Sequence, residues 1–214
     1  MAQQSFRYLK KIFKRIYKPE NDKKDYTIFN YLREAKNLVG TQCPVTSAET
    51  FTCLHQVDQI LKVCTAATVA EVMAKIAKNR VSSKEKTNFL YANEIINSSL
   101  CHMKYVAFQY FRTGLESIPD ERLRVHLRNL CALCGLCYTQ ECMAAGYDAG
   151  FLKRGDNSLI QEAINQLLLK IRPQAIPLVE LFGLSDHILT SAVGNSYGDI
   201  YEQHLEWAQA SRLN

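Results

Sequence analysis

The sequence lacks any long hydrophobic run, since no stretch approaches the roughly 20 apolar residues that a membrane span needs. Its N-terminus is polar and basic, without the apolar core of a secretory signal peptide. We therefore expect a soluble, intracellular chain with no membrane span. In such a compartment the eight cysteines are expected to remain free thiols rather than to form a disulfide framework.

Motifs typical of catalytic or nucleotide-binding loops are also missing. The chain has no Gly-x-Gly-x-x-Gly, Walker or Gly-x-Ser-x-Gly pattern, which argues against nucleotide-cradling loops. None of the five histidines belongs to a pair with metal-ligand spacing. His55 and His126 are interpreted as surface or half-buried helix residues. His102 is interpreted as a histidine satisfied within the core rather than a catalytic one.

Four cysteines, Cys131, Cys134, Cys137 and Cys142, superficially resemble an iron-sulfur run. The last spacing is four residues instead of the three of bacterial ferredoxins, and no proline follows. The cysteines also alternate with leucines in a helical segment, where free cysteine is a common small buried side chain. We therefore favour a structural role, and we keep an iron-sulfur or zinc module as a distant alternative.

Charge is concentrated at the N-terminus. A chain of 214 residues with 47% hydrophobic and 22% charged residues suits one globular core. The net charge is +5, but eight lysines and arginines in the first 24 residues face only Glu20 and Asp22. A helix over 3–17, ended by Pro19, would place apolar and basic residues on opposite arcs. Its basic arc could be solvated, packed on a part of the protein outside this chain, or bound to a membrane surface or a nucleic acid; the first two are favoured, and no nucleic-acid partner is predicted.

The remaining chain has helical periodicity, and no stretch alternates as a strand would. The predicted fold class is therefore all-α, a bundle of long helices. Capping boxes and helix-breaking residues predict the helix boundaries. The box Thr46-x-x-Glu49 predicts a helix that runs to about Lys78, the box Ser82-x-x-Glu85 predicts one that runs to Glu116, and Pro119 is expected in the first turn of a helix that runs to about Gly150. The box Ser158-x-x-Gln161 predicts a further helix, which Pro173 and Pro177 kink or restart and which ends at Gly183, and two more helices are expected over 185–192 and 199–210.

The most informative residues lie in the last third of the chain. Residues 171–182 read Ile-Arg-Pro-Gln-Ala-Ile-Pro-Leu-Val-Glu-Leu-Phe, and residues 193–208 read Val-Gly-Asn-Ser-Tyr-Gly-Asp-Ile-Tyr-Glu-Gln-His-Leu-Glu-Trp-Ala. This pairing resembles the carboxy-terminal signature of the acyl-CoA oxidases, I-R-x-x-A-x-x-L-V-[DE]-x-F followed by G-x-Y-D-G-x-V-Y-E-x-L-x-E-W-A. The family order Y-D-G is here Tyr197-Gly198-Asp199. Similar matches occur around 1–9, 100–106, 127–131 and 146–152, so the resemblance extends with gaps along nearly the whole chain.

The resemblance implies a flavoprotein family that oxidises fatty acyl-CoA to trans-2-enoyl-CoA with FAD and releases hydrogen peroxide, in peroxisomal β-oxidation. Residues 1–40 would then be the end of the middle helical domain and 41–214 the C-terminal helical domain. The family's catalytic Glu precedes the position that matches Met1, and Glu20 lies beyond Pro19, so we assign no catalytic, cofactor-binding or metal residue. We expect Tyr197, Tyr201 and Trp207 to be buried anchors of the final helix.

Two origins of the chain stay open: a fragment of a full oxidase, and a short paralogue without chemistry. Its ending, Ser211-Arg212-Leu213-Asn214, favours a fragment, because a Ser-Arg-Leu targeting signal has to be terminal. We expect this stretch to support subunit packing and homodimerisation, and to be inactive and free of FAD alone. The alternative is a short helical scaffold that pairs with a full-length oxidase subunit.

Overall fold

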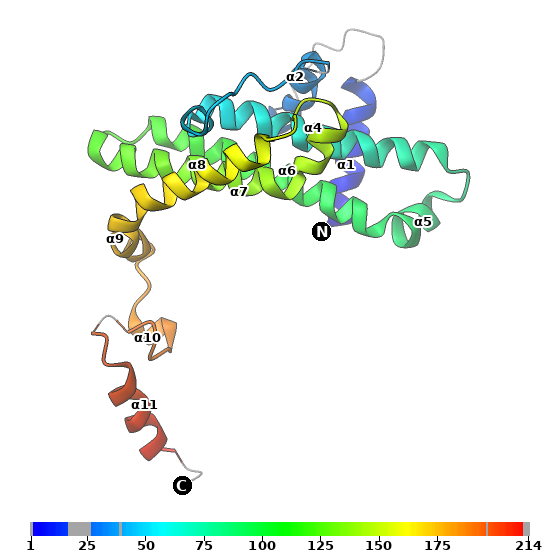
Figure 1. The fold of residues 1–214 in the computed structure, drawn as a ribbon. Helices are drawn as coiled ribbons and strands as arrows, with labels where there is room; N and C mark the ends of the chain where they lie inside the picture. Colours follow the sequence, from blue (N-terminus) through cyan, green and yellow to red (C-terminus); the bar gives the residue numbers. More distant parts are fainter. Residues whose placement is uncertain (1, 17–26, 39, 196, 212–214) are drawn as a thin grey trace. The chain divides into compact units, whose positions relative to one another are not determined.

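The computed structural model describes residues 2–16, 27–38, 40–195 and 197–211, and the predicted all-α class is confirmed: this part of the chain contains helices and no strand. It divides into two units, residues 1–171 and 172–214, which we describe separately. The helices of the first unit are α1 (Ala2–Ile16), α2 (Tyr31–Asn37), α3 (Ala48–Phe51), α4 (Leu54–Lys78), α5 (Ser83–Glu85), α6 (Ala92–Glu116), α7 (Glu121–Asp148) and α8 (Asp156–Ile171), with a 3-10 turn over Thr27–Phe29 and a π-helical turn over Lys86–Leu90 (Figure 1).

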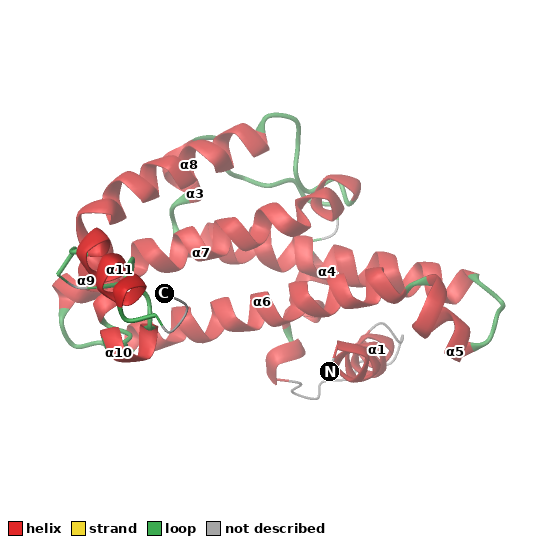
Figure 2. Ribbon diagram, turned by 90° about the horizontal axis from the view of Figure 1, so that it is seen from below, coloured by secondary structure: helices red, strands yellow, loops and turns green. Residues whose placement is uncertain are grey.

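The long helices α4, α6, α7 and α8 form a bundle in which α4 and α7 share the largest contact (Figure 2). Their approach depends on Gly135 of α7, where an added Cβ would meet a methyl carbon of Val57 at 2.4 Å and the ring of Phe108 at 2.7 Å. Val57, Phe108 and Leu136 are completely buried around this point. The bundle core is therefore built where a glycine lets two helix backbones come close.

The basic first helix lies against α6. Its apolar residues Phe6, Leu9, Ile12 and Ile16 are buried, so this face is covered within the chain itself. The predicted helix over 3–17 is confirmed as Ala2–Ile16, whereas Tyr17, Pro19 and Glu20 lie outside the described residues. No helix in the described ranges is long and apolar enough to cross a membrane.

Two predicted helix ends are confirmed, and the predicted start at Thr46 is wrong. The helix ends at Lys78 and Glu116 are confirmed, and the Ser82 hydroxyl accepts the Glu85 N–H at 3.2 Å. The prediction of one continuous helix from Ser82 to Glu116 is wrong, because the short α5 passes into the π-helical turn and a separate helix begins at Ala92, after Tyr91 leaves helical geometry with φ −123° and ψ 24°. Ser47, and not Thr46, caps α3, because its hydroxyl accepts the Thr50 N–H. The chain then leaves helical geometry at Cys53, which has φ −72° and ψ 122°, so a separate helix begins at Leu54.

Two further starts differ from the sequence expectation. Pro119 precedes the first turn of α7, because Asp120 is the N-cap and its carboxylate accepts the Arg122 N–H at 2.8 Å. Helix α8 begins at Asp156, two residues before Ser158; the buried Asp156 carboxylate accepts the Lys153 N–H at 2.9 Å and fixes the turn before the helix. Helix α2 was not predicted at all.

The second unit contains a 3-10 turn over Arg172–Gln174 and the helices α9 (Ala175–Glu180), α10 (Asp186–Leu189) and α11 (Ile200–Gln209). The predicted restart near the prolines and the final helix are confirmed. The predicted burial of its aromatic residues is wrong for this chain: Tyr197 is 88%, Tyr201 85% and Trp207 47% exposed. The reason is that this unit has almost no interior, since Ala192 is the one buried residue among those described in it.

Candidate functional site

A buried carboxylate, Asp58 of α4, is the centre of the most concentrated polar cluster in the described part of the chain. The hydroxyl of Tyr105 donates to Oδ1 at 3.1 Å, and the amide of Gln109 donates to the same oxygen. On the other oxygen, the Arg112 guanidinium lies at 3.2 Å and the Lys62 ammonium at 3.3 Å. Four donors from two helices therefore surround one carboxylate that is only 4% exposed.

Spacing along the helices explains why these residues meet. Tyr105, Gln109 and Arg112 are four and three residues apart and so share one face of α6, while Asp58 and Lys62 are four apart on α4. Lys62 also donates to Glu34 of α2 at 2.5 Å. The cluster thus contains two carboxylates and two cations, and it ties α2 to the bundle through charge-assisted bonds.

These side chains line a hollow of about 350 Å³, which we call the charged hollow. Burial and the neighbouring Asp58 raise the pKa of the Tyr105 phenol, so this hydroxyl stays protonated and acts as a donor. Because its oxygens are already engaged by four donors, Asp58 is poorly suited to abstract a proton from a bound molecule. The arrangement favours a structural tie over acid-base chemistry.

His102 lies beside the charged hollow, in the core position that the sequence predicted. It is 1% exposed, its Nδ1 lies 3.1 Å from the Tyr31 hydroxyl, and its ring stacks on Phe29 with centroids 4.7 Å apart. Burial lowers its pKa to about 4. The neutral ring therefore packs as an aromatic core residue. His55, by contrast, is exposed and bonds Gln59 on the same helix, and His126 is half-buried.

The four cysteines of the suspected iron-sulfur run all belong to the uninterrupted helix α7. Cys131 and Cys142 are buried, Cys134 is half-buried and Cys137 is exposed. Burial and then the neighbouring Cys134 raise the pKa of Cys131 to about 12, which disfavours the thiolate that a metal would bind. Within the described ranges, no three His, Cys, Asp or Glu side chains are placed to hold a metal ion.

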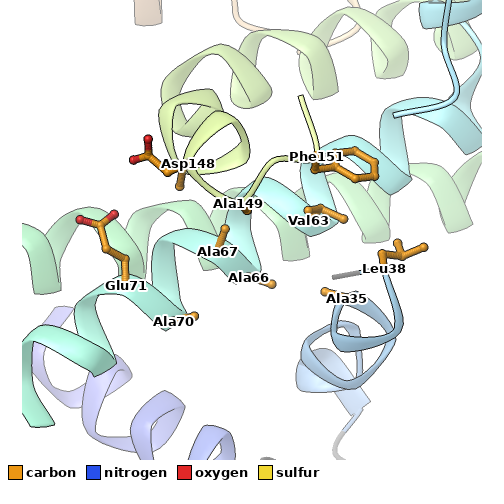
Figure 3. A pocket seen from close by; sticks show the side chains of 11 residues that line it. Ala35, Leu38, Val63, Ala66, Ala67, Ala70, Glu71, Asp148, Ala149 and Phe151 are labelled. Atoms are coloured by element: carbon orange, nitrogen blue, oxygen red, sulfur yellow. The ribbon is translucent and has the colours of Figure 1, made fainter. Parts of the chain in front are cut away.

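Two other hollows open on the first unit. One, of about 260 Å³, is lined mainly by alanines of α4 and α7, with the carboxylates of Glu71 and Asp148 at one end and Phe151 toward the other (Figure 3). The second, of about 510 Å³, is edged by Lys10, Lys14 and Lys86 over an apolar floor; we call it the basic hollow. Burial, followed by the charges of Lys14 and Lys86, lowers the pKa of Lys10.

Sequence reasoning missed the Asp58 cluster. The available signal was the pair Asp58 and Lys62 within the otherwise apolar run of α4, together with a second polar spacing at Tyr105, Gln109 and Arg112. These two patterns face one another only because α4 packs against α6, and this tertiary contact is not visible in the sequence of either helix.

Comparison with known proteins finds the same helical arrangement in acyl-CoA oxidases. The acyl-CoA oxidase family profile matches residues 53–214. Peroxisomal acyl-coenzyme A oxidase 1 of Rattus norvegicus is 33% identical over 152 residues, which are 70% of this chain and 23% of the rat protein. The crystal structure of an acyl-CoA oxidase from tomato (Lycopersicon esculentum) superposes with a TM-score of 0.87 at 21% identity, covering all of this chain and 32% of the tomato chain.

A third relative in structure is acyl-CoA oxidase-1 of Caenorhabditis elegans, solved in complex with FAD and ATP, with a TM-score of 0.79 at 19% identity over 98% of this chain and 31% of the worm chain. The chain thus spans about a quarter to a third of the length of the proteins it matches. Because the family profile covers most of the sequence and a relative reaches 33% identity, the chain belongs to the acyl-CoA oxidase family.

Proposed function

We propose that this chain is the helical packing portion of an acyl-CoA oxidase, the class of enzyme that oxidises fatty acyl-CoA to trans-2-enoyl-CoA with FAD and forms hydrogen peroxide. Its relatives carry the name peroxisomal, and the proposed setting is peroxisomal fatty-acid β-oxidation. Its partners would be the remainder of an oxidase subunit and a second subunit. Residues 1–40 would belong to the middle helical domain of that enzyme and 41–214 to its C-terminal domain.

One observation carries the packing role. The second unit contains the most family-like sequence of the chain, yet its large apolar side chains are exposed: Ile176 and Phe182 are each 77% exposed. Tyr201 is 85% exposed in the same unit. An exposed apolar surface of this density is typical of a protein interface. The flavin-bearing part of an oxidase is the partner that family membership suggests.

The described residues do not fit FAD. The flavin needs polar groups on its ring edge and a cradle for its pyrophosphate. The alanine-lined hollow offers apolar walls and two carboxylates, which would repel phosphate. The charged hollow has its cations engaged by Asp58 and Glu34, and the basic hollow offers lysines over apolar side chains without groups placed for the flavin ring. We therefore propose no chemical step on this chain alone.

The test compares the purified chain alone with the chain co-expressed with the flavin-bearing part of the rat oxidase, truncated before its matching region. Alone, the chain is expected to show no flavin absorbance after incubation with FAD, and no peroxide from a long-chain acyl-CoA. With the partner, the two should co-purify, and peroxide production should rise above that of the truncated partner. Peroxide production by the chain alone would contradict the proposal.

A matched variant pair connects the test to the second unit. Phe182→Ser and Tyr201→Ser should weaken co-purification, because they remove rings that are 77% and 85% exposed and thus available to a partner. Leu169→Ser, at a leucine of α8 that is 70% exposed in the first unit, serves as the control for loss of an exposed apolar side chain. Equal capture of all three variants would contradict the assignment of the packing surface.

A further inference from the structure

The basic hollow differs from the other two hollows because its cations have no counterion among the described residues. Its rim carries Lys10 and Lys14 of α1 and Lys86 of the π-helical turn. No ion pair in the described ranges engages these three lysines, and no acidic residue is among the described residues that line the hollow. In the charged hollow, by contrast, the cations pair with Asp58 and Glu34. The rim of the basic hollow is therefore a site of positive charge that is open to an anion.

The fold brings the three ammonium groups of this rim together. Lys10 and Lys14 are four residues apart on α1 and so share one face of that helix. The Lys86 ammonium donates to the carbonyl of Ile76 at 3.0 Å, in the C-terminal turn of α4, and this bond holds it in place. Because an ammonium has three donors, Lys86 retains hydrogens for a ligand. Burial and then the charges of Lys14 and Lys86 lower the pKa of Lys10, so the three cations repel one another, and a bound anion would relieve this repulsion.

The floor of the basic hollow is hydrocarbon. Ala70, Ala74 and Ala77 lie four and three residues apart on one face of α4, and Met73 of the same helix and Phe13 of α1 complete the floor. The space stays open because the alanine side chains are short and because α1 packs mainly on α6 rather than on α4. Its volume of about 510 Å³ is that of a typical small-molecule pocket. A cationic rim over such a floor suits a molecule that combines an alkyl chain with an anionic head.

We propose that the basic hollow is a binding site for a single-chain anionic amphiphile, a molecule with one alkyl chain and one carboxylate or phosphate head. The chain lies along the alanines of α4, and the ammonium groups of Lys10, Lys14 and Lys86 bind the head. A cationic head would add to the repulsion on the rim, and an inorganic anion would leave the hydrocarbon floor in water. The site goes beyond the proposed packing role and does not rest on it, because it involves neither flavin nor a second subunit.

The test is isothermal titration calorimetry of the full 214-residue chain with decyl phosphate, decanoate and decyltrimethylammonium, all below the concentrations at which they form micelles. The decyl anions are expected to bind at one site per chain, and their dodecyl counterparts about 10-fold more tightly, since each buried methylene adds about 3- to 4-fold. Tighter binding of decyl phosphate than of decanoate would assign a lipid phosphate as the natural head, and the reverse order or equal binding would assign a fatty-acid carboxylate. Absence of saturable binding, or equal affinity for decyltrimethylammonium or for inorganic phosphate alone, would overturn the inference.

A matched pair of charge variants assigns the head to the rim. The double variant Lys10→Gln with Lys14→Gln should weaken binding of the decyl anions by at least about 10-fold, because two of the three cations are lost. Lys11→Gln with Arg15→Gln removes the same charge from exposed positions of α1 that do not line the hollow, and should leave the affinity nearly unchanged. Circular dichroism shows that each variant is folded. Equal affinities of the two double variants would overturn the inference.

A second pair of variants assigns the alkyl chain to the floor. Ala74→Leu extends a side chain into the basic hollow and should remove the gain in affinity from the decyl to the dodecyl anion. Ala144→Leu, at an exposed alanine of α7 outside the hollow, should retain that gain. An unchanged dependence on chain length in Ala74→Leu would show that the amphiphile binds elsewhere, for example on the exposed apolar side chains of the second unit, and would contradict the proposed site.

Discussion

Gly135 of α7 faces Val57 of α4 so closely that a Cβ on the glycine would lie 2.4 Å from a Val57 methyl carbon. Gly135→Ala should therefore destabilise the fold by about 1–2 kcal/mol, because overpacking outweighs the better helix propensity of alanine. Gly114→Ala is the control, since no atom lies within 4 Å of its added Cβ, and it should be neutral or slightly stabilising. Urea unfolding followed by circular dichroism measures both, and equal midpoints would contradict the close approach.

The Asp58 cluster should be a large contributor to stability. Asp58→Asn leaves Arg112 and part of the Lys62 charge without a counterion in a partly buried site, and we expect a loss of about 2–4 kcal/mol. Glu71→Gln removes the exposed pair with Lys75 on the same helix and should cost far less, because an exposed ion pair contributes little to stability. The two free energies of unfolding are compared in the same urea titration. A cost for Asp58→Asn no greater than that of Glu71→Gln would mean that the cluster does not hold α2, α4 and α6 together.

The burial of His102 is expected to make the free energy of unfolding sensitive to acid. Its pKa is about 4 in the folded chain, against 6.5 for an unperturbed histidine, because burial disfavours the charged ring. The unfolded state thus binds the proton more readily. The stability that His102 contributes is full above about pH 6.5 and is lost as the pH falls from there to about 4, by up to roughly 3 kcal/mol.

The free energies of unfolding of the wild type and of His102→Gln are measured between pH 7 and pH 4. Because both proteins contain the same carboxylates, the difference between them reports the contribution of His102 alone. The difference between the two proteins should shrink as the pH falls, because only the wild type must keep a neutral imidazole. His55→Gln, at an exposed position, is expected to follow the wild-type curve. A constant difference between wild type and His102→Gln would show that the ring titrates alike in the folded and unfolded states.

Thiol labelling distinguishes the helical cysteines from a metal-binding set. Exposed Cys53 and Cys137 should react with an alkylating reagent in the native chain, whereas buried Cys131 and Cys142 should react only after unfolding. Mass spectrometry of peptides identifies the labelled sites. Protection of Cys137 together with stoichiometric iron or zinc in the native protein would instead support the iron-sulfur or zinc module.

Capping residues and helix-breaking residues in the sequence predicted those helix ends that depend only on neighbouring residues. The Ser82 cap and the helix ends at Lys78 and Glu116 follow from neighbouring residues, and the structure confirms them. Helix α2 escaped prediction because its seven residues are held by the burial of Tyr31 and Leu32 against distant helices rather than by a cap or a long period. The break at Cys53 likewise interrupts a sequence that is helical on both sides.

The candidate site was less predictable for a related reason. Asp58 acquires its four donors only when α4 packs on α6, which no pattern within either helix determines. The sequence predicts that Tyr201 and Trp207 are buried anchors of the last helix, and the structure shows that this prediction is wrong. Among the described residues of the second unit, only Ala192 is buried, so this unit by itself has no interior that could take up the rings of Tyr201 and Trp207.

The central claim, that this chain is the packing portion of an acyl-CoA oxidase, is tested most directly on the native polypeptide. An antibody against the exposed surface of α7 would capture it from its own cells, and intact mass and bound flavin would be measured together. The account predicts that FAD and a flavin-bearing oxidase segment accompany the sequence, either in one polypeptide much larger than 24.4 kDa or in a stable complex. A species of 24.4 kDa without flavin and without an oxidase partner would contradict it.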